Sequence, residues 1–272
     1  MEKKIILLDG AAGTTLWELA EAQGIERAPV WKYNIEQPQL VLELHRRYIE
    51  AGCDMIQCNT FSVNPESVAR SSDYTVEQVV TAAVELCKKA CEGTKVKPYL
   101  SFGPLSALLE PYGKLTRAET FEAYSRLARA GYEAGAEYVM LETFMDLEMM
   151  RIAVEAVRQF PLTVICSMTF EKRRRTMMGN SVQQIVEALE PMGVAAVGMN
   201  CSHGPVKAME IIREFAEKTA LPLYFKPNAG MGEEYGPADF AAEIAPALEL
   251  VSFVGGCCGC DDGYIKALGA LL

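Results

Sequence analysis

The sequence predicts an α/β fold in which eight parallel strands close into a single barrel. Short β-branched and apolar runs alternate along the 272 residues with longer stretches whose apolar residues recur every three or four positions. Strands that are apolar throughout indicate a parallel sheet with both faces covered by helices. The eight expected strands span residues 5–9, 54–58, 98–102, 138–142, 162–168, 195–200, 221–226 and 251–255.

The segments between the strands have the pattern of amphipathic helices that end near glycine. The clearest four cover residues 38–52, 75–93, 116–135 and 181–193. An open, doubly wound sheet gives a similar alternation, but each expected strand here ends in a chemically distinctive loop. A ring of such loops is typical of a (β/α)8 TIM barrel, whose site lies at the C-terminal rim of the strands. We therefore expect one domain over residues 1–272.

Composition argues against several classes of function. The net charge of −10 and the pI near 4.9 disfavour a nucleic-acid partner, because such binding depends on basic residues that neutralise phosphates. The N-terminal apolar run ends at Asp9, which makes it too short for a signal core or a membrane span. Nine cysteines, odd in number and scattered over helices and strands, are expected to be reduced. We expect a cytoplasmic protein that binds neither nucleic acid nor membrane.

Three cysteines in glycine-rich loops form the most informative pattern. Cys201 lies in NCSHGP after the sixth expected strand, and Cys257 and Cys258 lie in GGCCG after the eighth. The barrel brings both loops to one rim, and the glycines allow the bend that two adjacent cysteines need to reach one ion. Three thiolates suit zinc, with the fourth position left to water or substrate, as in catalytic sites. Such a site keeps a net negative charge and favours activation of a sulfur nucleophile.

The other cysteines are interpreted as small buried residues or remain open. We expect Cys53, Cys87, Cys91 and Cys166 to be structural. Cys260 follows the cysteine pair closely, so a spare thiol and a redox partner are both possible for it.

The histidines and the basic groups offer weaker signals. His203 lies two residues after Cys201, but we do not expect it to bind metal, and His45 is expected to pack within a helix. Lys226 ends the seventh expected strand, where an aldolase barrel could carry a Schiff-base lysine, although the three cysteines argue against that chemistry. The basic run 172–175, which includes Arg173–Arg175, is interpreted as a solvated loop, with docking of an anionic partner as the alternative.

These motifs resemble the homocysteine S-methyltransferase family, and most closely the homocysteine-binding module of cobalamin-dependent methionine synthase. In family order the chain has DGAAGT at 9–14, AGCDMIQCNTF at 51–61, SFGP at 101–104, ETFMD at 142–146, GMNCSHGP at 198–205, PNAG at 227–230 and GGCCG at 255–259. The resemblance implies a zinc barrel in which the thiolate of homocysteine completes a tetrahedral site and takes a methyl group, giving methionine. Cys201, Cys257 and Cys258 would be the zinc ligands and, with Glu142, the catalytic residues.

The resemblance also implies the contacts of the amino acid. Asp9 and Glu142 would hold its ammonium group, and two carboxylates at a barrel mouth suit a cation. The backbone N–H groups of Gly10 and Ala11 would bind its carboxylate. Cys58 stands where relatives often have Thr, and a thiol is the weaker donor, so this contact would be looser. Asn200 is interpreted equally as a group that orients the neighbouring cysteine or as a turn cap.

The methyl donor has several alternatives. The motifs DGAAGT and CNTF resemble those of the cobalamin-dependent members of the family, so we predict a methylated corrinoid protein, carrying methylcobalamin, as the donor. Because the chain ends at residue 272, we expect this donor to be supplied in trans. S-methylmethionine or S-adenosylmethionine is the alternative donor. Betaine is disfavoured because Thr143 and Ser62 stand where betaine-using relatives have aromatic residues. Two other classes remain, a zinc-dependent thiol-binding protein without turnover and a lyase that uses Lys226.

Overall fold

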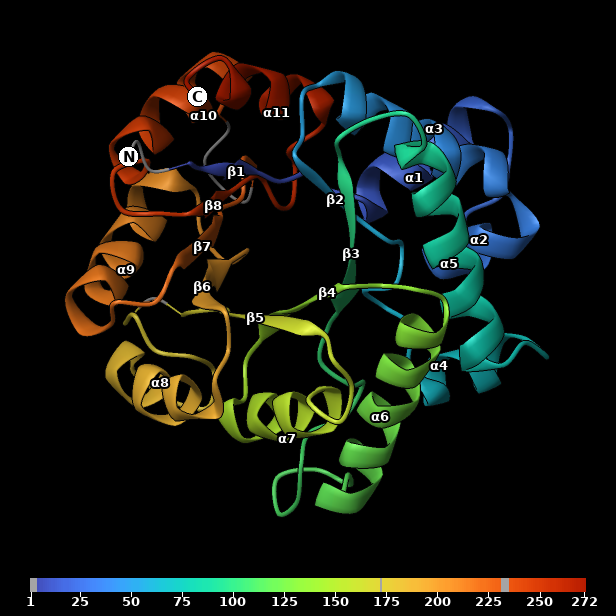
Figure 1. Cartoon of the computed structure of the whole chain (residues 1–272), viewed down its shortest axis with the longest axis horizontal. Coiled ribbons are helices and arrows are strands. Elements are labelled where there is room, and N and C mark those ends of the chain that lie inside the picture. Colours follow the sequence, from blue (N-terminus) through green and yellow to red (C-terminus); the bar gives the residue numbers. More distant parts are fainter. Residues whose placement is uncertain (1–3, 172, 231–234) are drawn as a thin grey trace.

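The computed structural model describes residues 4–171, 173–230 and 235–272, and in them eight parallel strands lie side by side around a barrel (Figure 1). The strands are β1 (Ile6–Leu7), β2 (Met55–Gln57), β3 (Lys97–Phe102), β4 (Tyr138–Phe144), β5 (Thr163–Met168), β6 (Ala196–Asn200), β7 (Leu223–Lys226) and β8 (Phe253–Val254). Their order is β1-β8-β7-β6-β5-β4-β3-β2. From β2 to β8 each strand thus pairs with the next one in sequence, and β1 pairs with β8, as the predicted barrel requires.

The barrel closes between β1 and β2 through a short contact. Leu8 forms an isolated parallel bridge with Met55, and the Asp54 backbone N–H donates to the Leu7 carbonyl oxygen at 2.8 Å. The Asp54 carboxylate also accepts from the Leu7 N–H at 2.9 Å. This contact joins the two ends of the sheet, which confirms the prediction of a (β/α)8 barrel rather than an open sheet.

Helices surround the strands (Figure 1). They are α1 (Gly13–Ala22), α2 (Tyr33–Glu36), α3 (Pro38–Glu50), α4 (Pro65–Ser71), α5 (Val76–Cys91), α6 (Arg117–Glu133), α7 (Leu147–Val157), α8 (Val182–Leu189), α9 (Pro205–Lys218), α10 (Pro237–Ile244) and α11 (Asp262–Gly269). Thr75, Thr116 and Ser181 begin α5, α6 and α8 with capping boxes, which satisfy exposed N–H groups of the first turn. None of the described helices is long and apolar enough to cross a bilayer.

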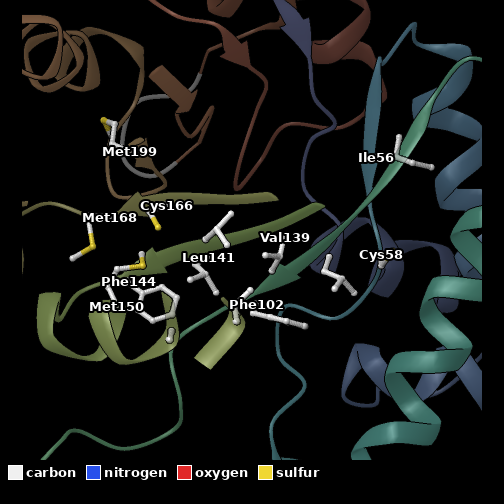
Figure 2. Packing of buried hydrophobic residues seen from close by; sticks show 14 of the residues in the cluster. Ile56, Cys58, Phe102, Val139, Leu141, Phe144, Met150, Cys166, Met168 and Met199 are labelled. Carbon is white, nitrogen blue, oxygen red and sulfur yellow. The ribbon is translucent and has the colours of Figure 1, made fainter. Parts of the chain in front are cut away.

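The strands separate two buried layers. The inner layer, inside the barrel, contains Leu8, Met55, Tyr99, Met140, Ile165, Ala196 and Tyr224. The outer layer packs the other face of the strands against the helices, and Figure 2 shows part of it around β3, β4 and β5. Because side chains alternate along a strand, the residue two positions after an inner-layer residue also points into the barrel, one step closer to the rim. This alternation decides which residues form the site.

Candidate functional site

Backbone hydrogen bonds fix the two loops that carry the three cysteines. The Cys201 N–H donates to the Lys226 carbonyl oxygen at 3.0 Å, and the Cys257 N–H donates to that of Pro227 at 2.9 Å. Cys201 has a φ of 59° and Ser202 a φ of 64°, so the chain turns sharply through the left-handed region directly after β6. Both loops are therefore held against the end of β7, in conformations that extended strands do not allow.

The sulfur atoms of Cys201, Cys257 and Cys258 lie within 4.8 Å of one another. The Sγ atoms of Cys201 and Cys258 are 3.7 Å apart. Zn–S bonds of about 2.3 Å at tetrahedral angles place two sulfurs about 3.8 Å apart. The cluster thus fits one zinc ion, and among the described residues no His, Asp or Glu joins the three thiols as a further close ligand.

The three thiols share protons with one another. Hydrogen bonds from Cys257 and Cys258 lower the pKa of Cys201 to about 2. The same contacts raise the pKa of Cys257, and the contact with Cys201 raises that of Cys258 to about 11. A cluster in which one thiol ionises easily beside two others suits a soft cation, because metal binding requires thiolates and releases their protons.

Asn200 links the cysteine cluster to the end of β4. Its Nδ2 donates to the Cys257 Sγ at 3.7 Å and to the Thr143 hydroxyl oxygen at 2.8 Å. Its Oδ1 accepts from the Thr143 N–H at 2.8 Å and from the Ser167 hydroxyl at 2.7 Å. Thr143 has a φ of 66°, and this pair of bonds holds that turn. Asn200 therefore orients a sulfur and supports the residue that follows Glu142.

Asn228, in the PNAG motif, contacts the other loop. Its Oδ1 accepts from the Cys258 N–H at 3.1 Å, and its own N–H donates to the His203 carbonyl oxygen at 2.9 Å. Its Nδ2 is buried without a hydrogen-bond partner among the described residues. A buried donor without a partner is rare in proteins and calls for an explanation. The Cys201 thiol supplies one, because the Asn228 side chain helps to lower its pKa.

The two predicted carboxylates lie buried inside the barrel, with different neighbours. Asp9 accepts from the Tyr99 hydroxyl at 2.6 Å, from the Lys226 Nζ at 3.0 Å and from the Gln57 N–H at 2.7 Å. Glu142 accepts from two hydroxyl groups, those of Ser101 at 2.5 Å and Tyr224 at 2.9 Å. Burial raises the pKa of both tyrosines, and the nearby carboxylates raise it further, so both phenols stay protonated donors.

Lys226 is a buried cation rather than a free amine. Its Nζ lies 3.2 Å from the Tyr99 hydroxyl and 5.9 Å from the centroid of the Tyr99 ring. Burial lowers the pKa of Lys226, but Asp9, Glu142 and Cys257 raise it more, and the net shift is upward. An ammonium held in an ion pair cannot attack a carbonyl carbon, so this geometry argues against the Schiff-base interpretation.

The groups expected to bind the substrate carboxylate are partly engaged within the protein. The Ala11 N–H donates to the Cys260 carbonyl oxygen at 2.8 Å, and the Gly10 carbonyl oxygen accepts from the Gln57 side chain at 3.0 Å. Cys58 lies in the outer layer with Ile56, where Figure 2 shows it among the packed side chains. The structure therefore groups Gly10 and Ala11 with the site but separates the Cys58 thiol from it.

The remaining cysteines lie apart from the sulfur cluster. Cys53, Cys87, Cys166 and Cys260 are buried and Cys91 is partly exposed, all as free thiols. Burial raises the pKa of Cys260 to about 12, and its Sγ donates to the Pro227 carbonyl oxygen at 3.8 Å. Its place behind the glycine-rich loop is that of a packed thiol.

The basic loop contacts its own surroundings. Arg174 lies 3.9 Å from the Glu214 carboxylate, and the Arg175 guanidinium donates to the Gly179 carbonyl oxygen at 3.1 Å. Lys172 lies outside the described residues. These contacts agree with the interpretation as a surface loop.

Sequence reasoning missed Gln57, Ser101, Tyr224 and Asn228, and for Lys226 it considered only a Schiff-base role, which it disfavoured. A usable signal was present, because alternation puts the second residue after each inner-layer residue inside the barrel. The pairs of inner-layer residue and second residue after it are Met55 and Gln57, Tyr99 and Ser101, Met140 and Glu142, Ile165 and Ser167, and Tyr224 and Lys226. The same rule places Cys58, next to Gln57, on the outer face.

Comparisons with known proteins match nearly the whole chain to one family. A model of the family described as homocysteine S-methyltransferase matches residues 6–272. Methionine synthase of Mycobacterium leprae (strain TN) is 29% identical over 301 residues, which cover 99% of this chain and 24% of that protein. Methionine synthase of Mycobacterium tuberculosis is 28% identical, and the match covers 99% of this chain and 25% of that protein. The chain thus spans about a quarter of the length of these relatives.

Solved structures confirm the fold. The metallated form of the homocysteine methyltransferase MmuM from Escherichia coli superposes with a TM-score of 0.83 at 23% identity, covering 99% of this chain and 96% of that one. The oxidized form of the same enzyme gives a TM-score of 0.84 at 24% identity, and the match covers 99% of this chain and 96% of that one. Because the family model matches nearly the whole chain, this protein belongs to the homocysteine S-methyltransferase family.

Proposed function

We propose that this chain transfers a methyl group to the thiolate of homocysteine, giving methionine, with a zinc ion held by Cys201, Cys257 and Cys258. The spacing of the three sulfurs, within 4.8 Å of one another, is the observation that carries the proposal. A bound zinc ion would keep the acceptor thiol deprotonated at neutral pH. The acceptor sulfur then supplies the electron pair of the new S–CH3 bond, while the pair of the broken bond stays with the donor.

The protein's own groups bind and orient the acceptor. The two buried carboxylates, Asp9 and Glu142, give the barrel interior a negative potential that suits the ammonium group of an amino acid. Asn200 supports the geometry of the sulfurs through its contact with Cys257. We propose the Gly10 N–H and the buried Nδ2 of Asn228 as donors for the acceptor's carboxylate at the same rim, whereas the Ala11 N–H already donates to the Cys260 carbonyl oxygen. Cys58 would influence the site through packing, since its side chain lies in the outer layer.

For the donor we propose a methylated corrinoid protein that binds at the barrel mouth. The support is the resemblance of DGAAGT and CNTF to the cobalamin group, together with the match to methionine synthases. The loops that follow the strands form one rim, so a partner that presents a methyl group there reaches the sulfur site directly.

The test is a donor panel with zinc-loaded protein and homocysteine, read as methionine formed by mass spectrometry. Methylcobalamin and a methylated corrinoid protein should give methionine, and the matched variant Cys91→Ser should behave like the parent because Cys91 lies on α5, outside the cluster. Rapid methylation from S-methylmethionine with none from either corrinoid would refute the donor. Stoichiometric homocysteine binding without methionine from any donor would refute turnover and leave a thiol-binding protein.

A further inference from the structure

Three charged side chains are buried together inside the barrel. Asp9 is 1% exposed, Glu142 is 4% exposed and Lys226 is 2% exposed. Two carboxylates and one ammonium leave this group with one net negative charge. A low-dielectric interior strongly favours compensation of that charge, so the interior is matched to one additional cation.

The carboxylate of Asp9 already has its cation. Lys226 Nζ lies 3.0 Å from its Oδ1, which also accepts from the Tyr99 hydroxyl, while its Oδ2 accepts from the Gln57 N–H. A second ammonium at Asp9 would face the charge of Lys226 at close range. At a separation of about 4 Å, two like charges repel by about 4 kcal/mol at an effective dielectric constant of about 20.

Glu142 differs because its partners are neutral. Its oxygens accept from the hydroxyls of Ser101 and Tyr224, and no cation of the described residues lies within 4.0 Å of it. Lys226 lies beyond ion-pair distance of Glu142, but the charge of Glu142 still raises the pKa of Lys226. Glu142 is also followed directly by Thr143, which Asn200 joins to the sulfur of Cys257. The uncompensated carboxylate therefore lies beside the sulfur site.

We propose that Lys226 is a resident ammonium that fills the cation position at Asp9, so that the ammonium group of the acceptor thiol is bound by Glu142 alone. This inference rests on the proposed function and assigns Lys226 and Asp9 as positioning residues that determine specificity. The acceptor is then a thiol with a single ammonium group.

The test separates amine recognition from thiol binding. Cobalt-loaded protein is titrated with homocysteine and with 4-mercaptobutanoate, the same chain without the ammonium group, and Kd is read from the absorbance of the cobalt–sulfur bond. The parent should prefer homocysteine by about 10-fold to 100-fold, as for a charge-assisted hydrogen bond. Glu142→Gln should lose this preference, whereas the double variant Asp9→Asn/Lys226→Met should keep it within about threefold.

The double variant removes the ion pair as a unit, and the amide that replaces the carboxylate can still accept from the Gln57 N–H and donate to the Tyr99 hydroxyl oxygen. Loss of the homocysteine preference in the double variant, as large as in Glu142→Gln, would overturn the inference, because Asp9 would then hold the ammonium group. No preference in the parent protein would overturn it as well.

Two further measurements keep the result interpretable. The single variant Lys226→Met frees the carboxylate of Asp9, so its preference for homocysteine should rise or stay, and a fall would contradict the inference even if the double variant does not fold. Binding of 4-mercaptobutanoate should be equal in the parent and in the double variant, because the double variant keeps the net charge of the barrel interior. If the parent binds neither thiol at its metal, the proposed function fails, which is a different result from a change in the ratio.

Discussion

Lowering the pH from 7 to 4 should destabilise the barrel through one buried histidine. His45 lies on α3 and is 1% exposed, and its Nε2 has no hydrogen-bond partner among the described residues. Burial lowers its pKa from 6.5 to about 4, which outweighs the upward effect of Asp9. As the pH falls below 6.5, the unfolded chain binds a proton that the folded protein does not bind until about pH 4.

The size of the effect follows from this interval. One pKa unit corresponds to about 1.4 kcal/mol, so an interval of about 2.5 units lowers the free energy of unfolding by about 3 kcal/mol. That stability is fully present above pH 6.5 and is lost as the pH falls toward 4. For a domain whose total stability is about 5 to 15 kcal/mol, the loss is large.

Urea unfolding of the parent and of His45→Leu, at half-unit steps from pH 7 to pH 4, measures this contribution. Other acidic groups titrate in both proteins, so the quantity of interest is the difference between their free energies of unfolding. That difference should change by about 1.4 kcal/mol per pH unit below 6.5 in favour of the variant. Parallel curves across the whole range would refute the reasoning.

Three further predictions concern the site. Cys201→Ala, Cys257→Ala and Cys258→Ala should each lose bound zinc on gel filtration with an unchanged circular dichroism spectrum, because the residues lie in loops; unchanged metal content in these variants would contradict the assignment. Asn200→Ala removes the contact with the Cys257 sulfur and should weaken metal binding by about 10-fold to 100-fold in competition with a chelator, and equal affinity would exclude an orienting role. Glu142→Gln should raise the KM for homocysteine by about 10-fold or more with zinc retained, and loss of zinc would mean that its role is different.

The sequence predicts the barrel well because its signals are local and repeated. All eight strands lie within two or three residues of their expected positions, and α5, α6 and α8 begin directly after Thr75, Thr116 and Ser181, whose side chains cap them. The cysteine site follows from the same logic. Once the strand order is known, Cys201 after β6 and Cys257 after β8 must meet at one rim, with β7 between them.

Side-chain pairing inside the barrel could not be predicted in the same way. The sequence places Asp9 and Lys226 at the ends of β1 and β7, which are separated by β8 in the sheet, so no adjacency along the chain or between paired strands indicates their contact. Cys58 is a different case, because alternation already puts it on the face opposite Gln57. Its motif position suggested a substrate contact, but the geometry of the strand directs its side chain to the outer layer.

The charge of the site connects these features. Three thiolates around a divalent cation leave one negative charge, which keeps an added sulfur electron-rich and therefore nucleophilic. The same charge, together with Asp9 and Glu142, would repel the carboxylate of an amino acid entering the barrel. Lys226 compensates the charge of Asp9 from within the protein. In the proposed complex, the acceptor's own ammonium would compensate a second charge, that of Glu142. A site that must be negative for its chemistry can thus bind a substrate that itself carries a carboxylate.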